Sequence, residues 1–146
     1  MTEYVVQILT ACLGSLGFAL IFRIEKKKLP VAALSGALTW GLYLLCGHFT
    51  DRVFLANLIA SFFAAAFAEF LAHLFKAPAT IFMISAVIPL VPGGTLYYTM
   101  SAIVENRQAD IVRYGVLTGM TAGALAFGLL LFTGVYRYYS RLGSRS

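Results

Sequence analysis

Charged residues divide this chain into five long apolar segments, and that pattern restricts the possible folds more than any other feature. The segments cover residues 4–22, 31–49, 53–75, 79–104 and 114–136. Each is long enough to cross about 30 Å of hydrocarbon as a helix. None shows the strict apolar–polar alternation of a transmembrane strand. We therefore predict an all-α fold: one membrane domain over residues 1–146, built as a polytopic bundle of five transmembrane helices.

The composition excludes most other classes of protein. The 146 residues are 60% hydrophobic and 12% charged, whereas a soluble domain is nearer half apolar and a quarter charged. Five spans leave no room for a soluble catalytic domain, and the sequence has no Walker motif, nucleophile elbow or His/Cys cluster. Cys12 and Cys46 lie in apolar segments without metal-type spacing. We predict no enzyme activity, no metal, no cofactor and no nucleic-acid partner.

The distribution of lysine and arginine predicts the orientation. Eight of them fall in the two connections and the tail that would share one side of the membrane, namely Arg23, Lys26, Lys27, Lys28, Lys76, Arg137, Arg141 and Arg145. Three fall on the other side, namely Arg52, Arg107 and Arg113. Because basic residues concentrate on the cytoplasmic side, we predict an outside N-terminus and a cytoplasmic C-terminus.

Small residues recur at helical spacing in the third and fifth segments. In the fifth, Gly115, Gly119 and Gly123 form a doubled G-x-x-x-G. In the third, two adjacent faces repeat every four residues: Ala56, Ala60, Ala64, Ala68 and Ala72 on one, and Asn57, Ser61, Ala65, Glu69 and His73 on the other. Such stripes let helix backbones approach closely in a bilayer. We predict that these faces pack against the bundle or against a partner.

Glu69 is the only acidic residue well inside an apolar segment, and His73 lies one turn away on the same face. A carboxylate at that depth is costly and usually faces the protein interior. It could load and release a proton, which makes Glu69, modulated by His73, a candidate proton-coupling or gating group. The alternative is a structural ion pair near the cytoplasmic end of the helix.

The fourth segment contains a break at Pro89 and Pro92-Gly93-Gly94. Proline removes a backbone hydrogen bond, and the break divides the segment into pieces of about 15 Å each, which places it near the bilayer midplane. A second piece starting at the glycines would present unpaired N–H groups suited to a carboxylate. The alternative is a proline kink used for packing. The predicted substrate-binding residues are Pro92, Gly93, Gly94, Thr95 and Tyr98.

Residues 77–79 and 88–100, Ala-Pro-Ala followed by Ile-Pro-Leu-Val-Pro-Gly-Gly-Thr-Leu-Tyr-Tyr-Thr-Met, resemble the threonine/serine exporter family. The chain is most similar to the small subunit of its split form, the YjjB-like proteins. The resemblance implies a bacterial inner-membrane protein that supplies five of ten spans. It implies a larger partner subunit and export of small carboxylate metabolites, either threonine and serine or succinate. The outside N-terminus is what a second, inverted half requires.

These observations predict a membrane subunit of a proton-coupled secondary exporter of small carboxylate metabolites, working with a larger five-span partner in the lipid bilayer. The alternative is a non-transporting structural or assembly subunit of a membrane complex. A membrane-embedded enzyme is a third option without a supporting constellation. A homo-oligomer is also possible.

Overall fold

The computed structural model describes residues 2–50 and 52–143, and every secondary-structure element in these residues is a helix. This confirms the predicted all-α fold. The elements, in chain order, are α1 (Thr2–Ile21), α2 (Leu29–Phe49), α3 (Val53–Phe75), α4 (Ala79–Val87), the 3-10 turn η1 (Ile88–Leu90), α5 (Gly93–Val104) and α6 (Gln108–Gly143).

Four helices are each long and apolar enough to cross a membrane: α1, α2, α3 and the Gln108–Ser140 part of α6. The pieces Ala79–Leu90 and Gly93–Val104 pass the same test only as a pair, bent by 49° at the break between them. Counted as one span, the pair gives the predicted total of five. The predicted break in the fourth span is therefore present.

Helix α6 extends well beyond the predicted span of residues 114–136. It runs for 36 residues, from Gln108 to Gly143. Charged residues mark the ends of an apolar run, but arginine and glutamine are good helix formers and do not end a helix. The apolar pattern therefore located this span correctly and underestimated its helix at both ends.

Three helices end in the same way, with a residue in the left-handed region. These residues are Arg23 (φ 54°), Lys76 (φ 49°) and Asn106 (φ 55°). After each, the next amide reaches back to a carbonyl five residues earlier, which is the Schellman arrangement that satisfies the last turn of a helix. The bonds join Ile24 to Ala19, Ala77 to Ala72 and Arg107 to Ala102, at 3.0, 3.1 and 2.9 Å. Each motif turns the chain sharply enough to begin the next antiparallel helix.

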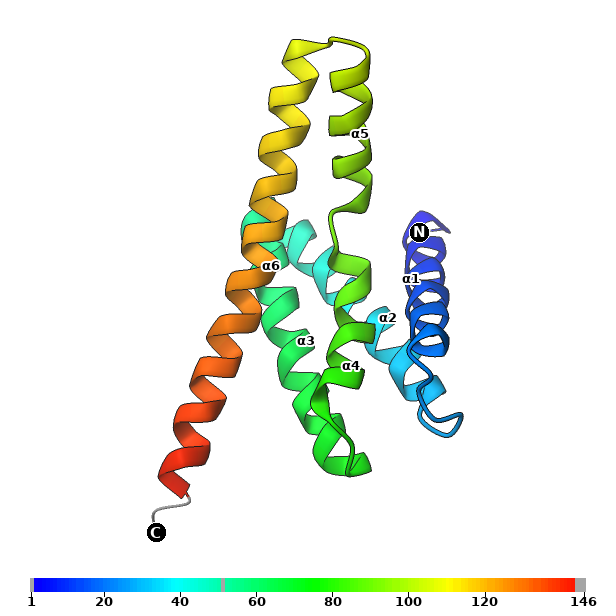
Figure 1. Cartoon of the computed structure of the whole chain (residues 1–146), viewed down its shortest axis with the longest axis vertical. Coiled ribbons are helices and arrows are strands. Elements are labelled where there is room, and N and C mark those ends of the chain that lie inside the picture. The colour runs from blue at the N-terminus through cyan, green and yellow to red at the C-terminus, as the bar shows by residue number, and fades with distance from the viewer. Residues whose placement is uncertain (1, 51, 144–146) are drawn as a thin grey trace.

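Helix α3 lies at the centre of the bundle, between α2, α4 and α6 (Figure 1). Its alanine stripe is buried over its whole length, from 0% to 8% exposed, and so are Asn57, Ser61 and Ala65 on the neighbouring face. The interior orientation is confirmed for the alanine stripe and for these three residues, whereas Glu69 is half-buried and His73 is exposed at the end of the second face. The large apolar side chains of α1, such as Leu13 and Ile21, are instead exposed, as expected for a surface that contacts lipid.

The close approach between α3 and α6 occurs at Gly128. A Cβ placed there would lie 1.9 Å from Ser61 Oγ and 2.6 Å from the Leu58 carbonyl oxygen. The predicted stripe does not make this contact. A Cβ at Gly119 or Gly123 would meet no atom within 4 Å, and one at Gly115 would make only an ordinary contact, at 3.8 Å, with Thr99. Within this chain the doubled G-x-x-x-G is therefore not the packing face, and its packing against a partner stays a prediction.

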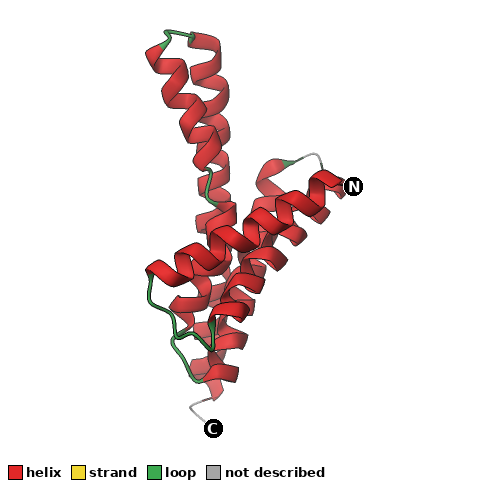
Figure 2. Cartoon of the chain, turned by 90° about the vertical axis from the view of Figure 1, so that its right-hand side faces the viewer, coloured by secondary structure: helices red, strands yellow, loops and turns green. Residues whose placement is uncertain are grey.

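Helix α5 and the first part of α6 form a two-helix arm. Figure 2 shows this arm rising beyond the ends of α1, α2 and α3. Its apolar side chains are exposed, including Leu96, Met100, Val112 and Val116. The connections α1–α2 and α3–α4 and the end of α6 lie toward the opposite end of the molecule (Figure 1), which we call the basic end because seven lysines and arginines belong to these described segments.

Candidate functional site

The break consists of η1, Val91 and Pro92, and it leaves part of the first turn of α5 without backbone partners. The Gly93 amide lies 2.7 Å from the Val91 carbonyl oxygen, and the Leu96 amide donates to the Pro92 carbonyl at 3.1 Å. The amides between them, those of Gly94 and Thr95, belong to the turn where a helix supplies no acceptor of its own. These two N–H groups can donate hydrogen bonds to an anionic group from outside the helix.

The space in front of the two glycines is open. A Cβ at Gly93 or Gly94 would meet no atom within 4 Å, and both residues are exposed. Thr95 is half-buried, and its hydroxyl donates to the Pro92 carbonyl at 3.2 Å. That hydroxyl therefore offers only its oxygen lone pairs to a ligand.

Tyr98 lies one turn beyond the glycines and faces α6. Its ring centroid is 5.3 Å from that of Tyr114 and 5.6 Å from that of Tyr97, and the side chain is 52% exposed. Pro92, Gly93, Gly94, Thr95 and Tyr98 are thus brought together on the first turns of α5, as the local sequence requires.

Glu69 and His73 lie near the basic end of α3. Glu69 is half-buried and His73 is exposed. The His73 ring has a partner that the sequence did not indicate: its Nε2 lies 2.6 Å from the Tyr136 hydroxyl of α6. No ion pair to Glu69 is found within residues 2–50 and 52–143.

The two groups of predicted site residues lie far apart. Tyr98 packs on Tyr114 and His73 bonds to Tyr136, and those two tyrosines stand about 33 Å apart along α6 at a rise of about 1.5 Å per residue. Glu69 and the glycines each lie about one turn inside these limits. The break and Glu69 are therefore separated by about 20 Å along the bundle axis, and one small molecule cannot contact both.

Sequence reasoning missed a cavity, open to the surface, that adjoins the break at Pro89. It has a volume of about 210 Å³, lies between α1, α2 and η1, and is lined by Gln7, Thr10, Ala11, Trp40 and Pro89. The indole Nε1 of Trp40 is buried and has no hydrogen-bond partner. The available signal was Gln7, a polar residue inside an apolar segment and four residues from Ala11.

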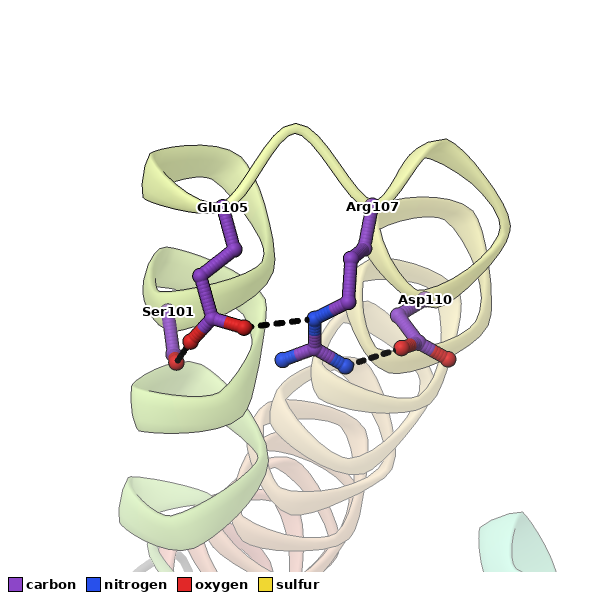
Figure 3. A network of polar contacts seen from close by, with 4 residues as sticks. All are labelled: Ser101, Glu105, Arg107 and Asp110. Carbon is purple, nitrogen blue, oxygen red and sulfur yellow. Dashed lines mark hydrogen bonds and ion pairs between the residues drawn. The ribbon is translucent and has the colours of Figure 1, made fainter.

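A polar network closes the tip of the arm, as Figure 3 shows. Ser101 donates to Glu105 Oε1 at 2.9 Å, Arg107 Nε donates to Glu105 Oε2 at 2.9 Å, and Arg107 also pairs with Asp110. The Ser101 hydroxyl and the neighbouring Arg107 guanidinium hold the pKa of Glu105 below its ordinary value. These contacts join the end of α5 to the start of α6.

Within residues 2–50 and 52–143, no three His, Cys, Asp or Glu side chains stand close enough to hold a metal ion together. The described residues instead offer uncharged polar groups at the break and at the cavity, and one carboxylate, that of Glu69, near the basic end of α3. These groups are able to bind a small polar solute.

Comparison with known proteins gives a family match over most of the chain. A family model described as "Threonine/Serine exporter, ThrE" matches residues 7–135. A relative from Haemophilus influenzae, described only as an uncharacterized protein, is 26% identical over 139 residues. That alignment covers 90% of this chain and 47% of the relative, so the chain spans about half the length of the curated relative it matches. No solved structure matches the chain.

Proposed function

The chain belongs to the threonine/serine exporter family, and from that premise we propose that it is a membrane subunit of a secondary exporter of small carboxylate metabolites. The candidate substrates are threonine- and serine-type amino acids or succinate. The observation that carries the proposal is the break between η1 and α5, where the Gly94 and Thr95 amides have no backbone acceptor and a Cβ at Gly93 or Gly94 would meet no atom within 4 Å.

We assign the substrate carboxylate to the first turn of α5. Backbone N–H groups and the positive end of the helix dipole favour an anion there, and the absence of side chains at Gly93 and Gly94 lets the carboxylate approach the backbone. Tyr98, one turn further on, adds a hydroxyl from the arm. Broken helices with this arrangement recur at substrate sites of secondary transporters.

We assign proton coupling or gating to Glu69, with His73 as its neighbour. The distance of about 20 Å from Glu69 to the break means that coupling would pass through the helices that connect them, by a change of packing, and not through direct contact with the substrate. Tyr136 would then set the position of the His73 ring through its 2.6 Å hydrogen bond.

We further propose that a larger five-span subunit of the same family completes the transporter in the bacterial inner membrane. Two facts support a partner: the relative is about twice as long as this chain, and the arm exposes apolar side chains along its length. Transporters of this kind combine inverted repeats, which accords with an outside N-terminus and a cytoplasmic C-terminus. A reporter fused after Ser146 should be active in the cytoplasm, and activity only in the periplasm would refute the orientation.

The decisive test is Gly94→Leu, co-expressed with the partner subunit. The leucine side chain would fill the space in front of the Gly94 and Thr95 amides, so export of labelled serine, threonine or succinate from inverted vesicles should be lost. Gly14→Leu is the matched control, because a Cβ at Gly14, on α1, also meets no atom within 4 Å. Co-purification with the partner should be unchanged in both variants.

Two results would overturn this proposal. If Gly94→Leu and Glu69→Gln both export normally whenever they assemble, the chain is a structural or assembly subunit. If this chain alone supports robust flux in liposomes, no partner is needed for transport.

A further inference from the structure

The arm and the three helices beside it end at different levels, which leaves a step at the end of the molecule opposite the basic end. Figure 2 shows the arm rising beyond α1, α2 and α3. A hollow at the foot of the arm brings the first turn of α3 beside α6, and its lining residues are Arg52, Val53, Phe54, Leu55, Leu117 and Met120. Helix α6 begins nine residues before Leu117, at Gln108, so the arm extends about 14 Å past the start of α3.

A bilayer alone cannot cover both levels of this step. If the membrane surface lies at the start of α3, the exposed apolar side chains of Met100, Val112 and Val116 stand in water. If it lies at the tip of the arm instead, Arg52 and the backbone of the α2–α3 connection lie about 14 Å deep, where lipid offers them no hydrogen-bond partners. Either level requires a polypeptide against the step, because only protein can present apolar groups to the arm and polar groups to the connection.

One face of α6 is available for that contact along the arm. We call it the outer face, and its residues, which share one side of the helix by their spacing, are Val112, Val116, Gly119 and Met120. Tyr114, on the opposite side of the helix, packs on Tyr98 of α5. The outer face has no such neighbour: its three large side chains are exposed, and a Cβ at Gly119 would meet no atom within 4 Å. A small residue between large ones lets a second helix approach closely there.

The hollow gives this surface an anchor point. It has a volume of about 500 Å³, opens to the surface, and is lined by five apolar residues and Arg52. Met120 belongs both to the hollow and to the outer face, so the two are continuous. The volume is about three times the roughly 150 Å³ that accommodates benzene in a protein interior, which is enough for one or two large apolar side chains. Such side chains in pockets supply most of the binding energy of protein interfaces.

The half that this chain lacks is the polypeptide with the right size and position. The Haemophilus influenzae relative continues beyond the matched region for about as many residues as lie within it, because the alignment covers 47% of its length. In the relative that extra segment is joined to the matched half, so it is held beside it. Two halves of inverted topology also place the bundle of one half at the level of the other's arm, which is where the step lies.

We propose that the larger subunit of the exporter docks in this step, with a helix packed on the outer face of the arm and an apolar side chain in the hollow beside Arg52. The proposal rests on the proposed function, which supplies the partner. It adds the surface that the partner occupies, and it assigns the arm to assembly of the two halves.

Photocrosslinking tests the contact directly. The photoreactive residue p-benzoylphenylalanine would replace Val116 in the full chain, co-expressed with the affinity-tagged larger family subunit from the same bacterium, and the membranes would be irradiated. We expect a product with the mass of one copy of each subunit. Leu13 of α1 is the control position, because its side chain is also apolar and exposed, at 66% against 56% for Val116. It should give no such product.

Gly119→Leu tests whether assembly needs this surface. Because a Cβ at Gly119 meets no atom of the described chain within 4 Å, the isolated variant should unfold in SDS no earlier than the wild type. Co-purification of the larger subunit should nevertheless fall at least five-fold. Gly14→Leu is the matched control, at an exposed glycine of α1 with the same open surroundings, and it should retain the larger subunit fully.

The outcomes separate this inference from the proposed function. The inference is overturned if the crosslink from position 116 joins two copies of this chain, if it reaches no protein, or if position 13 crosslinks the larger subunit equally well. It is also overturned if Gly119→Leu retains the larger subunit as well as Gly14→Leu does. The proposed function is judged by Gly94→Leu, which should lose export while the larger subunit still co-purifies.

Discussion

Replacing Gly128 with alanine should weaken the crossing of α3 and α6 more than any other single methyl group added to α6. The new Cβ would lie 1.9 Å from Ser61 Oγ, 2.6 Å from the Leu58 carbonyl oxygen and 3.0 Å from the Phe62 amide nitrogen. The Ser61 side chain could rotate away, at the loss of its 3.4 Å hydrogen bond to the Ala124 carbonyl. The Leu58 and Phe62 atoms are backbone of the central helix, so the two helices would have to separate.

The expected magnitude follows from this geometry. Overpacking a methyl group usually costs about 1–3 kcal/mol, and backbone contact places Gly128→Ala in the upper part of that range, at about 2–3 kcal/mol. At about 1.4 kcal/mol per factor of ten, the folded-to-unfolded ratio should fall roughly 30- to 150-fold. Gly119→Ala is the matched control on the same helix: its Cβ meets nothing within 4 Å, and alanine favours a helix interior by up to about 1 kcal/mol.

The measurement is reversible unfolding in mixed micelles of increasing SDS fraction, followed by helical circular dichroism. Gly128→Ala should unfold at a clearly lower SDS fraction than the wild type, and Gly119→Ala at an equal or higher one. Adding Ser61→Gly to Gly128→Ala should restore only part of the loss, because the Leu58 carbonyl contact remains. Equal midpoints for the Gly128 and Gly119 variants would refute the assignment of the crossing.

Three side chains at the two ends of the bundle give further predictions. Glu69→Gln should flatten the pH dependence of export while substrate affinity stays within a few-fold, as measured by flux in inverted vesicles over a pH series. Tyr136→Phe removes only the hydroxyl that bonds to His73, and it should lower stability by about 1 kcal/mol in the SDS assay, with the exposed Tyr138→Phe as control. Glu105 has a lowered pKa in the folded protein, so its contribution is complete above its ordinary pKa of 4.5 and is lost as the pH falls through the lower folded value. Glu105→Gln should therefore speed amide exchange at the tip relative to wild type at neutral pH, and the difference should disappear in strong acid.

Much of the fold follows from local patterns in the sequence. The number of spans depends on the length of apolar runs, and the break depends on Pro89 and Pro92, whose effect on the helix is intrinsic to the residue. The buried faces of α3 follow from the four-residue repeat of small side chains, because helical spacing alone fixes which residues share a face. These features needed no knowledge of neighbouring helices.

The close contacts could not be predicted in the same way. The motif at Gly115, Gly119 and Gly123 identifies a face that permits close approach, but it does not say which helix comes near it. The register of α3 against α6 decides this, and it places Gly128 against Ser61 instead. The cavity has the same origin: Gln7 and Trp40 are 33 positions apart, and only the packing of α1 on α2 makes both of them line one space.

The distance between Glu69 and the break also depends on packing, and it bears on how a transporter of this design would work. Pro89 precedes the 49° bend and Gly93, four residues later, follows it. If a ligand at the break binds more tightly when the two helices adopt one bend angle, it raises the population of molecules with that angle. Helix α3 packs on both α4 and α6, so a packing change near Glu69 can reach the same bend from the basic end. On this reasoning the broken helix, and not a shared pocket, is the element through which a proton at Glu69 and a substrate at the break would affect each other.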